Sequence, residues 1–129
     1  MSLKVDGFTS SIIFDVIRDG LNDPSQAKQK AESIKKANAI IVFNLKNKAG
    51  KTESWYLDLK NDGDVGKGNK SPKGDADIQL TLSDDHFQQL VEGKANAQRL
   101  FMTGKLKVKG NVMKAAAIEG ILKNAQNNL

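Results

Sequence analysis

A nearly unbroken apolar run close to the middle of the chain constrains the fold most. Within this run, Ile41, Phe43 and Leu45 alternate as the residues on one side of an extended strand do. Ile40 and Val42 make the other side of the same strand apolar as well. A strand that is apolar on both sides must be covered on both, so we expect it in the middle of a sheet.

Further strands are expected on both sides of this central one. Residues 52–61 alternate with period two after a short turn that contains glycine, which predicts an antiparallel hairpin with the central strand. The same alternation predicts strands at 76–83 and 105–109. Residues 61–75 are rich in Gly, Asn, Asp and Lys, so we expect a mobile loop there, broken by a short strand at Val65.

Helices are expected before and after these strands. Apolar spacing of three and four residues and capping residues predict them at 7–21, 25–38, 84–92, 96–103 and 112–122. Gly20 is expected to end the first helix. The second is almost entirely polar and should lie exposed. Strands in one sheet with helices segregated on one side define an α+β fold.

Length and composition limit the class of protein. The chain of 129 residues suffices for one core, so we expect residues 1–129 to form a single domain. It has no run of 18 apolar residues, no cysteine and no pattern of a secretory signal at its start. These features fit an intracellular protein without disulfides. The net charge of +5 comes mostly from lysine, which favours contact with anionic surfaces, lipid headgroups included.

No catalytic, metal or cofactor motif is complete. The tripeptide at 50–52 reads GKT, but Leu45 stands where a phosphate-binding loop needs its first glycine. His86 is the single histidine, and its acidic neighbours on a helix would point in different directions. We therefore expect neither an enzyme nor a cofactor.

A small basic nucleic-acid-binding or scaffold domain is the alternative. The lysines at 105–109 could follow a phosphate backbone. Binders of single strands add exposed aromatic side chains for base stacking. Aromatic residues are scarce here, and Phe43, Phe87 and Phe101 fall at positions expected to face the core. We therefore expect no nucleic-acid partner.

Several segments match a known family in order and spacing. They are IVFNLK, WYLDLKN, ADIQLTLS, a Gly93-Lys94 turn, Phe101 and, most specifically, GKLKVKGN at 104–111. From Gly7 to Leu122 the chain resembles the sterol carrier protein 2 domain, also called nonspecific lipid-transfer protein. The resemblance implies a five-stranded, mostly antiparallel sheet covered on one face by helices. It also implies an apolar cavity between them that accepts fatty acids, fatty acyl-CoAs or sterols, and no catalysis.

Family topology and apolar periodicity together suggest which side chains line this cavity. In the helix at 96–103, Leu100, Phe101 and Met102 are expected to point inward. The alanines at 115–117 would leave room for a ligand, although alanine runs are also common helix formers and close-packing sites. The expected lipid-binding residues are Ile12, Val16, Ile17, Leu82, Phe87, Leu90, Phe101, Met102, Met113, Ala116, Ala117 and Ile121.

The resemblance also implies partners and a location. It suggests a peroxisomal protein that cooperates with enzymes of β-oxidation. The chain ends in Asn127-Asn128-Leu129, which departs from the usual Ser/Ala-Lys-Leu signal, so a cytoplasmic location is the alternative. Lysines in the helix at 25–38 and at 105–109 are expected to make transient contact with anionic membranes. We expect a monomer, because no exposed apolar stripe is left over.

Overall fold

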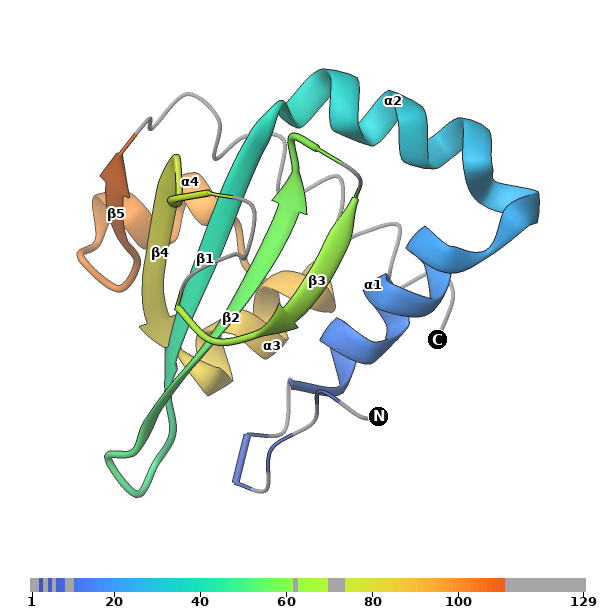
Figure 1. The fold of residues 1–129 in the computed structure, drawn as a ribbon. Helices are drawn as coiled ribbons and strands as arrows, with labels where there is room; N and C mark the ends of the chain where they lie inside the picture. The colour runs from blue at the N-terminus through green and yellow to red at the C-terminus, as the bar shows by residue number, and fades with distance from the viewer. Residues whose placement is uncertain are drawn as a thin grey trace.

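Strand β1 lies at the centre of a mixed sheet (Figure 1). The computed structural model describes residues 3, 5, 7–8, 11–61, 63–69 and 74–110 of the chain, and within them five strands follow the order β3-β2-β1-β4-β5. The strands are β1 (Ala39–Lys46), β2 (Thr52–Leu59), β3 (Asp64–Lys67), β4 (Ile78–Ser83) and β5 (Lys107–Gly110). Neighbouring strands are antiparallel except for β1 and β4, which are parallel.

The central position predicted for the apolar strand is confirmed. Phe43 of β1 pairs with Trp55 of β2 and with Leu80 of β4, so all three side chains share one face. Ile40 and Val42 point to the other face and are buried there as well. The predicted hairpin and the short strand at Val65 are also confirmed.

The hairpin turn between β1 and β2 is held by one side chain. Asn47 accepts hydrogen bonds through its Oδ1 atom from the backbone N–H groups of Ala49 (3.0 Å) and Lys51 (2.9 Å). Gly50 has a φ of 84°, which a residue with a Cβ atom adopts only at a cost. The turn therefore fixes the register that brings the apolar positions of the two strands together.

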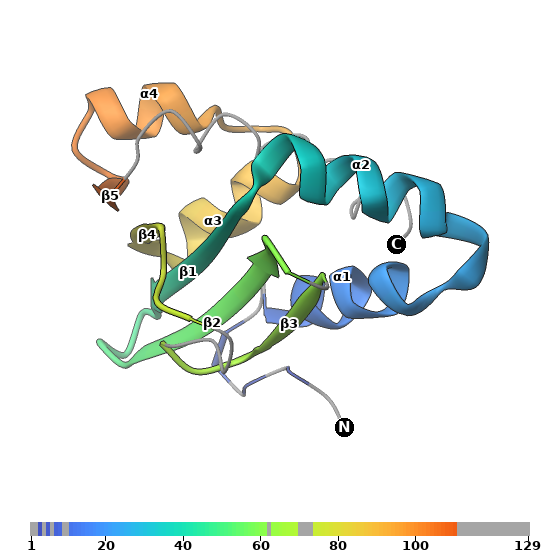
Figure 2. The same ribbon diagram turned by 45° about the horizontal axis from the view of Figure 1, so that its top comes forward.

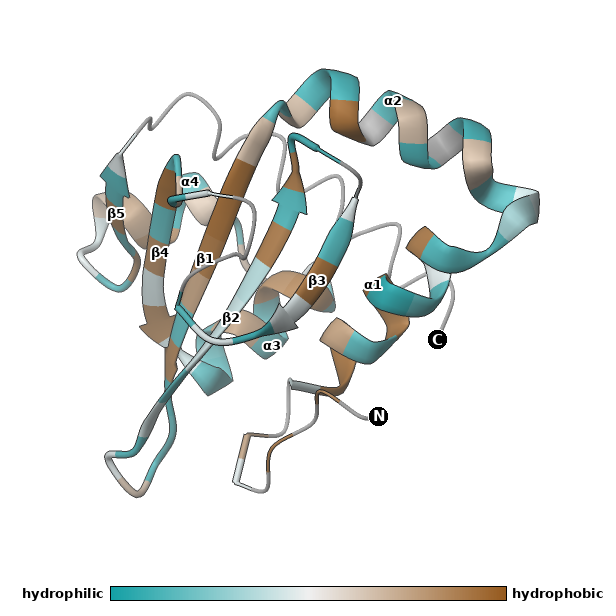
Figure 3. Cartoon of the chain, in the orientation of Figure 1, coloured by the Kyte–Doolittle hydropathy of each residue, from teal (hydrophilic) through white to brown (hydrophobic). Residues whose placement is uncertain are grey.

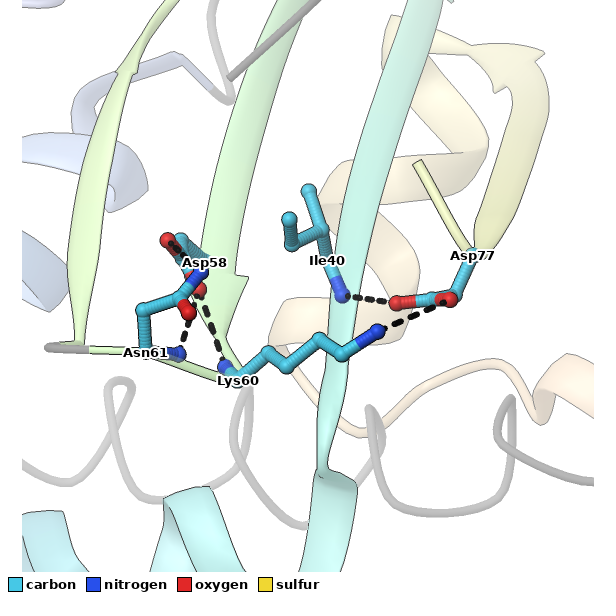
Figure 4. A network of polar contacts seen from close by, with 5 residues as sticks. All are labelled: Ile40, Asp58, Lys60, Asn61 and Asp77. Atoms are coloured by element: carbon cyan, nitrogen blue, oxygen red, sulfur yellow. Dashed lines mark hydrogen bonds and ion pairs between the residues drawn. The ribbon is translucent and has the colours of Figure 1, made fainter. Parts of the chain in front are cut away.

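Carboxylates organise the end of the sheet where β1 begins (Figure 4). Asp77 accepts a hydrogen bond from the Ile40 N–H at 2.9 Å and donates its own N–H to the Ile40 carbonyl at 2.8 Å. Asp58 is buried and accepts from the backbone N–H groups of Lys60 and Asn61. The Lys60 ammonium lies 3.7 Å from Asp77. These contacts tie the parallel strand β4 to the end of the hairpin.

Helices α1, α3 and α4 form a layer against the sheet. Their bounds and those of the surface helices are α1 (Ile12–Asn22), the 3₁₀ turn η2 (Pro24–Gln26), α2 (Ala27–Ala37), α3 (Asp84–Val91) and α4 (Ala97–Met102). Figures 1 and 2 show α1 toward the β3 edge, α4 toward the β5 edge and α3 between them. The α+β prediction is therefore confirmed.

Helix α2 is largely exposed, as expected. It is mostly hydrophilic, in contrast to the apolar strand β1 (Figure 3). Its Lys30 and Ile34 side chains approach Gly63 in the turn between β2 and β3. The helix ends at Asn38, which adopts a left-handed conformation (φ 42°) and donates its N–H to the Ile34 carbonyl.

The first helix differs from its predicted bounds of 7–21. It begins at Ile12, because the buried Ser11 hydroxyl donates a hydrogen bond to the Phe8 carbonyl (2.6 Å) and accepts one from the Val5 N–H (3.0 Å), which holds the preceding chain in a loop. Gly20 does not end the helix. The chain leaves it at Asp23, whose extended backbone suits the residue before a proline.

Aromatic rings fill the space between the sheet and helices α1 and α3. Phe14 of α1 stacks on Trp55 with ring centroids 4.9 Å apart, and on Phe87 at 5.4 Å. Phe43 lies 5.5 Å from Phe14, and Phe8 meets Trp55 edge-on at 5.6 Å. Each of these side chains is at most 1% exposed. This aromatic cluster (Phe8, Phe14, Phe43, Trp55 and Phe87) is a packed core.

The aromatic cluster predicts a contrast between two phenylalanines. Phe14→Ala should lower the free energy of unfolding by about 3–5 kcal/mol, because it leaves a cavity among rings that cannot close over it. Phe101→Ala should cost about 1 kcal/mol or less, because that side chain is 45% exposed. Urea unfolding followed by Trp55 emission measures both. Equal losses would contradict the assignment of the core.

Candidate functional site

Helix α3 is positioned by a capping serine. Ser83 ends β4, and its hydroxyl oxygen accepts a hydrogen bond from the His86 N–H at 3.0 Å. This is the cap predicted from the sequence. It starts the helix in the orientation that buries Phe87 in the aromatic cluster, while Leu90, one turn further, is only half-buried. Leu90 therefore packs at the margin of the core.

A tight turn connects α3 to α4. Gly93 has a φ of 76°, and the N–H groups of Lys94 and Ala95 both donate to the Gln89 carbonyl, at 2.9 and 3.2 Å. Asn96 then caps α4 by accepting the Arg99 N–H through its Oδ1 atom at 3.2 Å. The turn thus places α4 beside the last turn of α3.

The other end of α4 is fixed in a similar way. The N–H groups of Lys105 and Leu106 both donate to the Leu100 carbonyl, at 2.8 and 3.0 Å. Leu106 is buried next to the start of β5. These hydrogen bonds therefore fix the position of the Lys105 backbone relative to α4.

A groove of about 750 Å³ lies between α3 and α4. Leu90, Val91 and Leu100 give it an apolar floor. Its rim carries amide, imidazole and charged groups. The remaining lining residues are His86, Gln89, Glu92, Gly93, Lys94, Ala95, Asn96, Arg99, Thr103 and Lys105.

The cations of the groove differ in their partners. The Lys94 ammonium lies 2.9 Å from Oε2 of Glu92, and the other carboxylate oxygen, Oε1, accepts a hydrogen bond from the Gln88 side chain at 2.7 Å. These hydrogen bonds, first from Lys94 and then from Gln88, lower the pKa of Glu92. Within the described ranges, no carboxylate lies at ion-pair distance from Arg99 or Lys105.

The predicted lipid-binding residues fall into three groups. Ile17, Leu82 and Phe87 are buried, whereas Val16 and Leu90 are half-buried. The exposed ones are Ile12 (47%), Phe101 (45%) and Met102 (76%). The other predicted residues, like the predicted helix at 112–122, lie outside the described residues; they are Met113, Ala116, Ala117 and Ile121.

The expected inward orientation of Phe101 and Met102 is wrong. In α4 only Leu100 is buried, at 7% exposure. Successive residues of a helix point about 100° apart, so a helix of six residues that buries Leu100 turns its next two side chains away. Ile12 is exposed for the same reason, because Ile13 faces the core.

The structure does not bring all these residues together. Those on α1 and those on α4 belong to opposite sides of the helical layer, with α3 between them (Figure 2). Sequence reasoning also missed Phe14, although it lies three residues before Ile17 and seven before Leu21, which is the spacing of an apolar helix face. No pattern in the sequence indicated that Arg99 and Lys105 line the same groove.

The described residues contain neither a membrane-spanning helix nor a cluster of metal-ligating side chains. No helix there has the length and hydrophobicity needed to cross a bilayer. Nor do three or more His, Cys, Asp or Glu side chains in those ranges gather as they would around a metal ion.

Comparison with known proteins assigns the family. The SCP-2 sterol transfer family matches residues 19–123. The oleate-induced peroxisomal protein POX18 of Candida maltosa is 52% identical over 124 residues, which is 95% of this chain and 94% of that protein. The peroxisomal multifunctional enzyme A of Dictyostelium discoideum is 35% identical over 97% of this chain, which spans only 27% of that enzyme.

Solved structures agree on the fold. The sterol carrier protein domain 2 of Helicoverpa armigera has a TM-score of 0.70 at 23% identity, over 100% of this chain and 97% of that one. Sterol carrier protein 2 of Aedes aegypti in complex with palmitate has a TM-score of 0.59 at 23% identity, over 88% and 94%. The chain belongs to the SCP-2 sterol transfer family. The predicted resemblance is confirmed, and the chain is a lipid-transfer domain.

The ion pair at the groove predicts a measurable titration. Because the folded-state pKa of Glu92 is lowered, its ionised form stabilises the fold above the pKa of the unfolded chain, and that contribution is lost as the pH falls through the folded-state pKa. Lys94→Met should raise the Glu92 titration midpoint, followed by NMR of the side-chain carboxyl carbon. Lys51→Met, in the hairpin turn, is the control and should leave it unchanged. An unmoved midpoint in Lys94→Met would rule out the pairing.

Proposed function

We propose that the chain binds fatty acids, fatty acyl-CoAs or sterols, carries them between membranes and catalyses no reaction. Family membership across residues 19–123 is the observation that carries this proposal. The palmitate complex of the Aedes aegypti relative supports a fatty acid as one ligand. The proposed unit is a monomer in which residues 1–129 form a single domain.

The acyl chain lies against the half-buried and exposed members of the predicted set. The aromatic cluster under α1 and α3 is closely packed, so a ligand among those rings would have to separate them. At the α4 end, in contrast, Leu90, Phe101 and Met102 offer apolar surface that the described chain leaves open. Leu82 and Phe87 are buried members of the same proposed set. Met113, Ala116, Ala117 and Ile121 complete the proposed lining. The remaining proposed residues, Ile12, Val16 and Ile17, lie on α1 at the other side of the helical layer (Figure 2).

Burial of the acyl chain supplies the affinity. Each methylene removed from water contributes about 0.8 kcal/mol. A micromolar dissociation constant corresponds to a binding free energy of about −8 kcal/mol. A dozen buried methylenes therefore supply much of it, even after the entropy cost of ordering the ligand and the side chains around it. Such binding depends little on the polar end of the ligand, which explains how one site accepts several lipid classes.

The proposed location is the peroxisome, where β-oxidation enzymes would receive the cargo. The support is that POX18 is named an oleate-induced peroxisomal protein and is 52% identical to this chain. The Dictyostelium discoideum relative is a peroxisomal multifunctional enzyme. A fluorescent fusion that remains diffuse in the cytoplasm would contradict this location.

Loading and unloading occur at anionic membranes. Exposed lysines on α2 (Lys28, Lys35 and Lys36) and at the β5 edge (Lys107 and Lys109) would contact the lipid headgroups. These contacts are electrostatic, so salt should weaken them.

A charge placed in the proposed lining tests the binding site. Leu90→Asp combined with Phe101→Asp should weaken palmitate binding at least tenfold, because the acyl chain would lie against carboxylates. Ile34→Asp, on α2 and away from the lining, should leave affinity within about twofold. Displacement of a fluorescent fatty acid measures affinity, and circular dichroism confirms folding. Unchanged affinity in a folded double variant would overturn the site.

Transfer kinetics test the membrane step. Fluorescent fatty acid should move from the protein to vesicles with anionic lipid several-fold faster than to neutral vesicles, and 0.5 M salt should remove the difference. Lys35→Gln with Lys36→Gln should reduce the preference for anionic vesicles. Rates that are independent of vesicle charge would exclude docking driven by charge.

A further inference from the structure

The positive charge of the chain is concentrated in residues 93–110, which form α4, β5 and the turns beside them and are called the α4–β5 edge below. Five of the chain's 20 Lys and Arg residues and none of its 15 Asp and Glu residues lie in this stretch. The rest of the chain therefore holds 15 residues of each sign, and the net charge of +5 is that of the α4–β5 edge. The five cations are Lys94, Arg99, Lys105, Lys107 and Lys109, all of them exposed.

Two large apolar side chains are exposed in the middle of these cations. Phe101 is 45% exposed and Met102 is 76% exposed. Among the described residues, Ile12 on α1 is the only other large apolar side chain that is exposed. Neighbouring apolar side chains with a charged rim are typical of a surface that has a partner.

Hydrogen bonds at both ends of α4 hold these side chains outward. The Asn96 side chain accepts the Arg99 N–H at 3.2 Å, and the Thr103 hydroxyl donates to the Arg99 carbonyl at 2.9 Å. The Lys105 N–H donates to the Leu100 carbonyl at 2.8 Å, which returns the chain toward α4 before β5 begins. Figures 1 and 2 both show α4 beside β5 at one end of the molecule. The apolar tip and the nearest cations are thus presented together.

The other exposed helices lack this combination. Helix α1 exposes Ile12, but its Arg18 lies within ion-pair distance of both Asp15 (3.4 Å) and Asp19 (3.8 Å), so that helix has no excess of positive charge. Helix α2 exposes lysines and, in its described part, no large apolar side chain. Within the described ranges, exposed apolar side chains and unbalanced positive charge therefore occur together only at the α4–β5 edge.

An anionic bilayer suits such a surface best. Its headgroups attract the cations, and its acyl region accepts apolar side chains a short way below them. Lysine and arginine side chains are long enough to stay among the headgroups while neighbouring apolar groups lie deeper. A stable protein interface would bury about 800 Å² on each partner around an apolar centre, which two side chains ringed by cations do not provide. Nucleic acid would need several aromatic platforms, and Phe101 is the only exposed aromatic side chain among the described residues.

We propose that α4 docks the domain on anionic membranes by inserting Phe101 and Met102 below the headgroups, which Arg99 and Lys105 hold. The inference rests on the proposed lipid-transfer function and names the element that enters the bilayer. Phe101 also belongs to the proposed acyl-chain wall. Docking through α4 therefore brings the ligand against the acyl region of the bilayer, and the ligand passes between the two without crossing water.

Site-specific fluorescence locates the inserted element. The sequence contains no cysteine, so one introduced cysteine carries the environment-sensitive dye NBD at a single known position. Labelled Met102→Cys, Ile12→Cys and Ala31→Cys report on α4, α1 and α2. Each is mixed, without fatty acid, with phosphatidylcholine vesicles that contain or lack phosphatidylserine. We expect the dye at position 102 to shift its emission to the blue with the anionic vesicles, and the dyes at positions 12 and 31 to stay in water.

Unlabelled variants test whether the same side chains drive docking. Met102→Gln should reduce the fraction of ligand-free protein that sediments with anionic vesicles by about threefold or more, because an apolar anchor is lost. Ile12→Gln makes a matched change on α1 and should leave that fraction unchanged. Arg99→Gln/Lys105→Gln should also reduce it, because the headgroup contacts are lost.

Several outcomes would overturn the proposal. A blue shift at position 12 or 31 without one at position 102 assigns docking to α1 or α2. Vesicle binding without a shift at any position means that charge alone holds the protein at the surface. The proposal also fails if no vesicles bind, or if position 102 responds more strongly to single-stranded DNA or to an acidic protein. Displacement of a fluorescent fatty acid by palmitate decides the proposed lipid binding separately: saturable displacement leaves it standing in each of these cases, and its absence in folded protein removes the function on which the inference rests.

Discussion

The stacking of Phe14 between Trp55 and Phe87 is the contact on which the rest of the structure depends. It joins α1, α3 and the centre of the sheet with ring centroids about 5 Å apart, and each aromatic pair adds about 0.5–1.5 kcal/mol beyond its buried area. The Trp55 indole N–H also donates to the Leu3 carbonyl at 2.8 Å, which fastens the start of the chain to the same cluster.

A core filled in this way restricts where a lipid can lie. Next to the aromatic cluster, Leu90 of α3 is only half-buried although Val91 after it is buried, and α4 buries Leu100 alone. Among the described residues, Phe101 and Met102 leave apolar surface exposed on α4, and Ile12 does so on α1. In the proposed site, the acyl chain lies on the α4 side, away from the closely packed aromatic cluster, so the domain could stay folded while its ligands differ.

Apolar periodicity over long segments predicted the fold. The short helix and the turn near the candidate site were too short for periodicity to predict which side chains face it. The apolar faces of β1 and the cap at Ser83 follow from periodicity and local hydrogen bonding, and both are confirmed. Phe101 and Met102 were placed wrongly because a six-residue helix gives periodicity too few turns to define a face. Arg99 and Lys105 line the same groove because backbone hydrogen bonds to the Leu100 carbonyl fold the chain after α4, and no residue pattern in the sequence predicts those bonds.

Intermolecular NOEs between ¹³C-labelled palmitate and the protein would show where the acyl chain lies. We expect NOEs from the acyl methylenes to Leu90 and Phe101, and none to the rings of Phe14 and Trp55, which stay stacked at 4.9 Å. NOEs from the methylenes to both of those rings would contradict it. They would mean that the aromatic cluster opens to admit the ligand and is itself the binding site.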